Sequence, residues 1–378
     1  MNISEKVLRN DEKAIYTLRD LYRNHGYSHY KISKFEEYDL YAHHKNFLVS
    51  DSILSFTDKN GKLMALKPDV TLSIAKHVSN DSSNVTQKVY YNEHVYRTSA
   101  ASDGFREIMQ TGLECIGNVD IYAESEVIML AMKSLQSISE DYLLDLSHIG
   151  LLEGMLEAAG LDISYHSSVL NLIGSKNIPG IRALCTNLSI DETMCQRICE
   201  MVNLYLPLTE ATEVLSSLIV GEKAAKALNE LRQISEILDI YGLSKHLFFD
   251  FSIVSDTHYY DGLIFKGFLN GLSESLLSGG RYDRLLTQLG KKEGMGAIGF
   301  AVYLDRLERF GSEEESFDID VLLIYEDNID IRSIVQAVKL LNESGKTVRT
   351  ATAPDPSVRC RQLLKIGKGG IEILETYD

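Results

Sequence analysis

Two strand-like stretches that lie close together in the sequence constrain the fold more than any other feature of this chain. They are "VTQKVYYNEHVYR" (85–97) and "GFREIMQTGLECIG" (104–117), and the short polar segment "TSAASD" (98–103) joins them. Both contain β-branched and aromatic residues, which favour strands. A connection this short allows antiparallel pairing and leaves no room for a crossover helix. We therefore expect an antiparallel sheet built around this pair.

A helix and a hairpin are predicted before this pair. Residues 11–25 have apolar side chains at helical spacing, and Gly26 follows as a stop signal. In "SILSFTDKNGKLMALKPDVT" (52–71), Asn60-Gly61 separates two alternating apolar runs. This dipeptide is a strong signal for a tight hairpin turn. The second strand of the hairpin should end at Lys67-Pro68, since proline cannot continue a paired strand.

The rest of the chain predicts an α+β protein with an insert and a second domain. Helical patterns cover 123–138 and about 165–245, and strand patterns return at "HLFFDFSIV" (246–254), "GLIFKGF" (262–268) and "LLSGG" (276–280). We assign a core to 1–312, with a helical insert at about 165–245. After the acidic segment "RFGSEEESFD" (309–318), residues 317–378 predict a small βαβαβ domain of the α/β class.

Composition narrows the classes of function. The 378 residues carry a formal net charge of −16, which disfavours a protein that grips nucleic acid through a broad basic surface. The five cysteines form no CxxC pair and no zinc-type Cys/His spacing, so we expect reduced thiols and no metal site. No apolar leader begins the chain and no run approaches about 20 apolar residues. A cytoplasmic protein without a membrane partner is the expectation.

The clearest candidate site lies on the stretch 105–116. Alternation places Arg106, Gln110, Gly112 and Glu114 on one face of this strand. Such a polar row either faces solvent or lines a groove in which the amide and the carboxylate orient a small polar ligand. A second polar row at Asp250 and Ser252 favours a groove that the two rows share. No P-loop motif is present, so no nucleotide cofactor is expected.

Two further segments have open interpretations. Arg281, after Gly279-Gly280, is suited either to hold a carboxylate or phosphate or to form a structural ion pair with Asp283. Tyr259 and Tyr260 belong to "SDTHYYDGLIFKGF" (255–268), which has the pattern of a strand. Adjacent strand residues point to opposite faces, so only one tyrosine of the pair is expected to face a given cavity.

In this order the segments resemble the class II aminoacyl-tRNA synthetases, specifically the histidyl-tRNA synthetase family. "FTDKNGKLMALKPDVTLSIAKHV" is similar to the family's hairpin and the motif that follows it, and "VYRTSAASDGFREIMQTGLECIG" is similar to its motif 2. "GGRYDRLLTQLG" with "AIGFAVYLDRL" resembles motif 3, and the stretch from Ser255 to Phe268 resembles the histidine-binding motif. The resemblance spans nearly the whole chain. It implies an antiparallel sheet flanked by helices and a C-terminal domain like a truncated anticodon-binding domain.

The chain departs from this family where catalysis would need charge. The family's arginine before the tyrosine pair falls on Ser255, and its aspartate falls on His258. Thr98 and Ser99 follow Arg97 where the family has an acid, and Tyr303 stands where a glycine is expected beneath the adenine. Motif 1 also lacks its proline. Because aminoacylation needs cations around ATP, these departures imply a chain with no catalytic residues of its own.

The amino-acid side of the family's pocket is retained. The resemblance assigns histidine binding to Asp69, Thr71, Arg97, Gln110, Glu114, Tyr259 and Tyr260, and it leaves Arg106 and Arg306 as the residual arginines of motifs 2 and 3. This profile resembles the family's non-catalytic branch, the regulatory subunits of ATP phosphoribosyltransferase. That branch implies a class II-type dimer that assembles with a short-form ATP phosphoribosyltransferase catalytic subunit and mediates L-histidine feedback in histidine biosynthesis.

The alternative is an enzyme, namely a divergent histidyl-tRNA synthetase or a relative that activates another amino acid. Ser255 and Tyr303 argue against it. The C-terminal domain ends after its third predicted strand, and the net charge is acidic, so tRNA is not expected as a partner.

Overall fold

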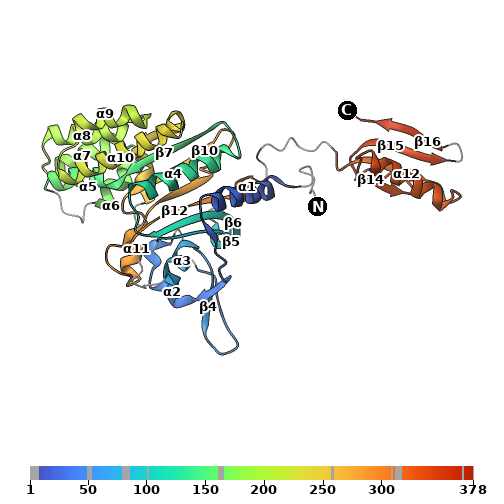
Figure 1. The fold of residues 1–378 in the computed structure, drawn as a ribbon, viewed down its shortest axis with the longest axis horizontal. Coiled ribbons are helices and arrows are strands. Elements are labelled where there is room, and N and C mark those ends of the chain that lie inside the picture. The colour runs from blue at the N-terminus through green and yellow to red at the C-terminus, as the bar shows by residue number, and fades with distance from the viewer. Residues whose placement is uncertain are drawn as a thin grey trace. The chain divides into compact units, whose positions relative to one another are not determined.

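The computed structural model describes residues 8–48, 53–78, 86–99, 102–160, 166–256, 259–307, 310, 317–367 and 370–377. The chain divides into two compact units, Met1–Phe310 and Gly311–Asp378, and each is considered by itself (Figure 1). Most of the acidic segment 309–318 lies outside the described residues. No helix of the described part is long and apolar enough to cross a membrane.

A mixed sheet forms the centre of the first unit. Among the described residues its strand order is β1-β5-β6-β12-β11-β10-β7-β9-β8. The strands are β1 (Ser28–His29), β5 (Gln87–Ser99), β6 (Ser102–Gly117), β7 (Tyr142–His148), β8 (Tyr205–Pro207), β9 (Leu247–Asp250), β10 (Leu263–Leu269), β11 (Leu277–Arg281) and β12 (Gly296–Tyr303). The predicted pairing of β5 with β6 is confirmed and is antiparallel. Among the described strands of this sheet, only β1 with β5 and β7 with β9 pair in parallel.

Each face of the sheet packs on different elements. Figure 1 shows α1 (Asn10–Asn24) and α4 (Ile121–Gln136) on one side, and α2 (Tyr38–Ala42) and α3 (Thr71–His77) on the other. The helix predicted at 11–25 is thus confirmed as α1. The predicted hairpin is also confirmed: β3 (Ser55–Thr57) pairs with β4 (Leu63–Leu66), with Gly61 at φ +82°, and β2 (Phe35–Glu37) pairs with the other edge of β4. α11 (Asp283–Gln288) packs against α3.

The segment 165–245 is mostly helical and also supplies a strand. Its helices are α6 (His166–Gly174), α7 (Ile178–Asn187), α8 (Glu192–Asn203), α9 (Leu208–Leu218) and α10 (Glu222–Ile240), and α5 (Ile149–Ala158) precedes them. Between α8 and α9, strand β8 pairs with β9 at the edge of the core sheet. The insert therefore shares backbone hydrogen bonds with the core and is not a purely helical appendage.

The strands predicted at 246–254 and 255–268 are both shorter than expected. Strand β9 ends at Asp250, a 3-10 helix covers Phe251–Asp256, and Tyr259 lies in a turn before β10 begins at Leu263. Neighbouring Ile253 and Val254 are both buried, which a strand with only one covered face does not allow. His258 lies outside the described residues, and Ser255 is described only in its backbone.

The second unit has a four-stranded sheet of order β14-β13-β15-β16. Its elements are β13 (Ile319–Tyr325), α12 (Ile331–Glu343), β14 (Val348–Ala351), β15 (Cys360–Gly367) and β16 (Gly370–Thr376). The prediction of a second helix in the βαβαβ unit is wrong, because residues 360–367 form strand β15. Cys360, Leu363 and Leu364 have helical spacing, but β15 is central and buries residues on both faces, so it needs no strict alternation.

Candidate functional site

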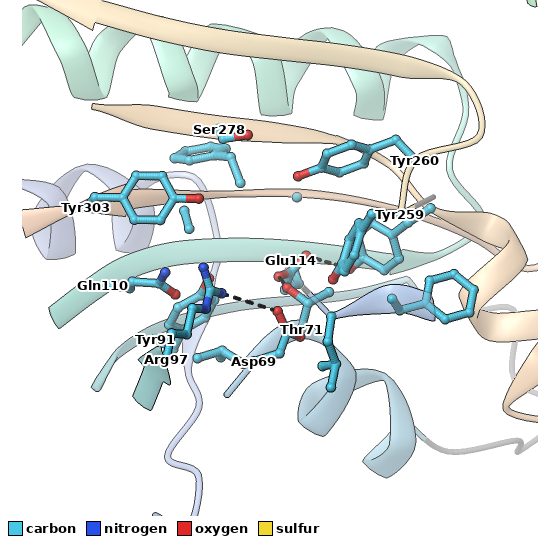
Figure 2. Close-up of a pocket in the computed structure, with 17 residues that line it drawn as sticks. Asp69, Thr71, Tyr91, Arg97, Gln110, Glu114, Tyr259, Tyr260, Ser278 and Tyr303 are labelled. Carbon is cyan, nitrogen blue, oxygen red and sulfur yellow. Dashed lines mark hydrogen bonds and ion pairs between the residues drawn. The ribbon is translucent and has the colours of Figure 1, made fainter. Parts of the chain in front are cut away.

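A cavity of about 310 Å³ lies on the sheet face that carries Glu114 (Figure 2). Side chains from β5, β6, β11 and β12 form its floor, and residues after α2, at the start of α3 and before β10 form its sides. The lining residues are Phe47, Leu48, Asp69, Val70, Thr71, Tyr91, Arg97, Gln110, Glu114, Tyr259, Tyr260, Ser278, Tyr282, Gly299, Phe300, Ala301 and Tyr303.

Small side chains on the central strands make room for the cavity. Glu114 pairs with Gly299 across the sheet, and Ala301 pairs with Ser278. A Cβ atom at Gly299 would lie 1.8 Å from Glu114 Oε2, so no other residue fits there with the carboxyl in place. The absence of bulk on β11 and β12 is what leaves space above the sheet.

Asp69 and Arg97 form the ionic side of the cavity. Asp69 precedes α3, and its Oδ1 accepts a hydrogen bond from the Leu72 N–H at 2.7 Å. Arg97 Nη2 lies 3.7 Å from Asp69 Oδ2, and Arg97 Nε donates to the Pro68 carbonyl at 2.9 Å. Burial raises the pKa of Asp69, and the Arg97 guanidinium opposes that shift. Arg97 is the only positively charged side chain among the described lining residues.

Glu114 is held at the bottom of the cavity by two hydroxyl donors. Thr71 Oγ1 donates to Oε1 and the Tyr282 hydroxyl donates to Oε2, each at 2.5 Å. The residue is 1% exposed, and burial raises its pKa to about 8 although both hydrogen bonds lower it. Burial thus favours the protonated form of this carboxyl, and a nearby cationic group would favour its ionisation.

Two polar groups of the cavity have no partner among the described residues. Gln110 Nε2 and the Tyr259 hydroxyl are buried without a hydrogen bond. A buried polar group of this kind costs free energy unless something satisfies it. Gln110 needs an acceptor on one side of the cavity, and Tyr259 needs a polar partner on the other (Figure 2). A ligand with polar groups at both ends would meet both needs.

The structure brings together the residues that the sequence assigns to the amino-acid side. Each of them lines the cavity: Asp69, Thr71, Arg97, Gln110, Glu114, Tyr259 and Tyr260. Both tyrosines take part because they lie in a turn, so the prediction that only one of them faces a given cavity is wrong. Their binding of histidine stays a prediction.

The residual motif arginines lie apart from this group. Arg106 is exposed and does not line the cavity. The Arg306 guanidinium stacks on the Tyr303 ring at 4.5 Å, pairs with Glu274 at 2.8 Å and donates to the Ser275 carbonyl. Arg281 has the structural role that the sequence left open, because it pairs with Asp283 at 2.8 Å and with Glu124.

The sequence did not identify Tyr91, Tyr282 and Ser278 as cavity residues. Tyr91 had a usable signal, since it pairs with Gly112 in the β5–β6 register and an aromatic residue opposite a glycine covers the gap. No local sequence pattern could have identified Tyr282, because its contact with Glu114 joins residues 168 positions apart.

The second polar row is not part of this cavity. Asp250 pairs with Lys176 at 3.0 Å and accepts from the Ser252 hydroxyl at 2.6 Å, and neither residue of the row lines the cavity. The predicted shared groove is therefore wrong. Nearby Asp145 is buried, and burial together with the charge of Asp250 raises its pKa to about 7. The described residues hold no group of three or more side chains suited to bind a metal ion.

Known proteins similar to this chain agree with one another. A family model described as histidyl-tRNA synthetase matches residues 2–307. The ATP phosphoribosyltransferase regulatory subunit of Clostridium kluyveri is 30% identical over 338 residues, which cover 87% of this chain and 85% of that protein.

Solved structures give the same picture for the fold. An ATP phosphoribosyltransferase regulatory subunit/histidyl-tRNA synthetase from Bacillus halodurans superposes with a TM-score of 0.73 at 24% identity, covering 92% of this chain and 90% of that one. The ATP phosphoribosyl transferase (HisG:HisZ) complex from Thermotoga maritima contains a chain that matches with a TM-score of 0.61 at 21% identity, covering 78% and 97%. These likenesses confirm the predicted class II aminoacyl-tRNA synthetase-like fold.

Proposed function

This chain belongs to the histidyl-tRNA synthetase family and, within it, to the ATP phosphoribosyltransferase regulatory subunits, and we propose that it regulates a short-form ATP phosphoribosyltransferase catalytic subunit in histidine biosynthesis. One observation carries the proposal. The amino-acid side of the site forms a cavity with its acids and tyrosines in place, whereas Arg306 is held by Tyr303, Glu274 and a backbone carbonyl. This arrangement supports a pocket for an amino acid, without a free set of cations for ATP among the described lining residues.

The effector in this proposal is L-histidine, bound in the cavity. Its ammonium group would pair with Asp69, and its imidazole would lie against Tyr259 and Tyr260 with a nitrogen directed at Glu114. Its carboxylate would face Arg97 and the unpartnered Gln110 Nε2. Charge and hydrogen-bond complementarity support this pose, since the ammonium group, the carboxylate and one imidazole nitrogen would each meet an opposite or complementary group.

The chain itself acts without catalysis in this proposal. Activation of an amino acid by ATP places negative charge on transferring phosphates, which cations or metal ions must stabilise. Arg97 is the one cation among the described lining residues, and it already contacts Asp69 and the Pro68 carbonyl. ATP and phosphoribosyl diphosphate would bind to the partner subunit.

The proposed assembly is a hetero-oligomer with the catalytic subunit, built on a class II-type dimer of this chain. The Thermotoga maritima complex supports the proposed contact with the catalytic subunit. Exposed Phe35 and Phe56, which pack edge to face at 5.3 Å on the small sheet, support protein contacts on that surface. The acidic charge argues against tRNA, and five free thiols fit a reducing cytoplasm.

The test is formation of phosphoribosyl-ATP by a short-form catalytic subunit, with and without this chain, across a histidine titration. We expect activity to rise when the chain is added and to fall as histidine increases. The control is histidine-dependent exchange of pyrophosphate into ATP by the chain alone, which should be absent. Exchange activity together with no effect on the transferase would contradict the proposal and would identify a synthetase.

A further inference from the structure

Tyr303 forms the side of the cavity opposite the tyrosine pair. It is the last residue of β12, and the strand register pairs it with Gln110 of β6. Figure 2 shows Tyr303 and Tyr260 on opposite sides of the cavity, each with its hydroxyl directed inward. Tyr303 therefore limits how far a ligand can extend past Gln110.

Neighbouring segments hold both the backbone and the ring of Tyr303 in place. The Tyr303 backbone N–H donates to the Leu276 carbonyl at 2.9 Å, which fixes the end of β12. The 3-10 helix Leu304–Leu307 that follows carries Arg306, whose guanidinium lies 4.5 Å from the ring centroid. Arg306 is in turn held by Glu274 at 2.8 Å and by the Ser275 carbonyl. A ring that is stacked on an anchored guanidinium has little freedom to move aside.

We propose that Tyr303 determines ligand specificity by admitting a free amino acid and excluding one whose carboxyl group carries a substituent. The inference rests on the pose given under the proposed function, in which the ligand carboxylate lies beside Arg97 and Gln110. Because Gln110 is paired with Tyr303, any group attached to that carboxylate extends into the volume of the ring. The excluded class comprises carboxyl esters, amides and acyl phosphates.

A purely structural role for the Tyr303–Arg306 stack makes a different prediction. If the ring only closed the end of β12, its removal would lower the stability of the fold and weaken all ligands in the same proportion. A specificity role changes the ratio of affinities between a compact ligand and an extended one. The ratio is therefore the quantity to measure.

The experiment is calorimetric titration of the full-length chain with L-histidine, its methyl ester and its benzyl ester. Both esters lack the carboxylate charge, so their affinity ratio reports the room beyond the carboxyl group and not the contact with Arg97. For the unchanged chain we expect the benzyl ester to bind at least about tenfold more weakly than the methyl ester. In Tyr303→Ala the two esters should bind within about threefold of each other, because the ring no longer blocks the larger one.

Tyr303→Phe is the matched control, because it keeps the ring and loses only the hydroxyl. It should retain the discrimination of the unchanged chain. Thermal unfolding of each variant establishes that it is folded. An unchanged ester ratio in folded Tyr303→Ala, or equal binding of both esters by the unchanged chain, would overturn the inference.

The failure of this inference is distinguishable from failure of the proposed function. The same titration is run with other free amino acids and their two esters. If histidine does not bind but another free amino acid does, the effector assignment fails, and the ester ratio for that amino acid still tests Tyr303. If the unchanged chain shows no preference for any free amino acid over its esters, the specificity role of Tyr303 is overturned.

Discussion

Two pairs of buried carboxyl groups with different surroundings lie over the same face of the large sheet. At one end Asp69 and Glu114 line the cavity, with Arg97 as their cation. At the other end Asp145 and Asp250 share Lys176, which pairs with Asp250 at 3.0 Å. Strand register connects the two ends, because Glu114, Gly299, Gly280, Ile264 and Ser147 are paired in succession across the sheet. From β6 to β9 the separation is roughly 24 Å, at about 4.8 Å per strand.

The difference between the two ends lies in the size of the neighbouring side chains. On β12 and β11 this face carries Gly299, Ala301 and Ser278, so a cavity remains above the sheet. On β10 and β9 the same face carries Ile264 and Phe248, and the ring of Phe248 stacks on Tyr205 at 5.4 Å. Buried acids alone therefore do not make a binding site. A cavity forms only where the side chains beside the acids are small.

The largest effect is expected when bulk is added at the open end. In Gly299→Ala the new Cβ would meet Glu114 Oε2 and the Leu113 carbonyl, so Glu114 must leave its position or the strands must separate. We expect loss of detectable histidine binding and a decrease in the free energy of unfolding of about 1–3 kcal/mol, measured by calorimetry and urea denaturation. Gly367→Ala is the control, since its Cβ meets nothing within 4 Å. Histidine affinity that survives in Gly299→Ala would show that the ligand binds elsewhere.

A smaller effect is expected when one charge is removed from each pair. Asp69→Asn keeps an oxygen to accept from the Leu72 N–H but loses the charge that would bind the ligand ammonium. We expect histidine affinity to fall about 30-fold, because a hydrogen bond to a charged group contributes about 2 kcal/mol. The matched variant Asp250→Asn at the closed end should change that affinity by less than about twofold. Equal losses in the two variants would contradict the distinction between the open and closed ends.

The smallest effect is a difference in how stability depends on pH. A carboxyl whose pKa is raised by folding keeps its proton in the native state after the unfolded chain has lost it. The free energy of unfolding therefore falls as pH rises, over the window from the ordinary pKa to the native pKa. That window runs from 4.5 to about 8 for Glu114 and from 3.8 to about 7 for Asp145.

Of these two carboxyl groups only Glu114 contributes between pH 7 and 8, so denaturation at several pH values can separate their contributions. In the unchanged chain the free energy of unfolding should fall by up to about 1.4 kcal/mol per pH unit in that interval, and Glu114→Gln should remove this decrease. Asp145→Asn should keep the decrease between pH 7 and 8 and should reduce the pH dependence of the free energy of unfolding below pH 7. If Asp145→Asn flattened the curve between pH 7 and 8 as much as Glu114→Gln did, the assignment of the two windows would be wrong.

Local sequence patterns predicted the elements that are formed by neighbouring residues. The helix at 11–25, the Asn60-Gly61 hairpin and the antiparallel pair at 85–117 each depend on periodicity or turn chemistry within about 35 residues, and all three are confirmed. The resemblance to a known family then identified seven residues that line one cavity. Their role in histidine binding is still a prediction.

Tertiary contacts decided what local patterns left ambiguous. Residues 360–367 became a strand because both faces of β15 are buried, and Tyr259 and Tyr260 share a cavity because a turn replaces the expected strand there. The Tyr282 hydroxyl reaches Glu114 across 168 positions of sequence, which no local pattern encodes. By itself the sequence determined which residue types were available and where the locally encoded helix, hairpin and first strand pair form. Only the packed sheet decided which acids face open space, because that depends on the size of side chains brought alongside by strand pairing.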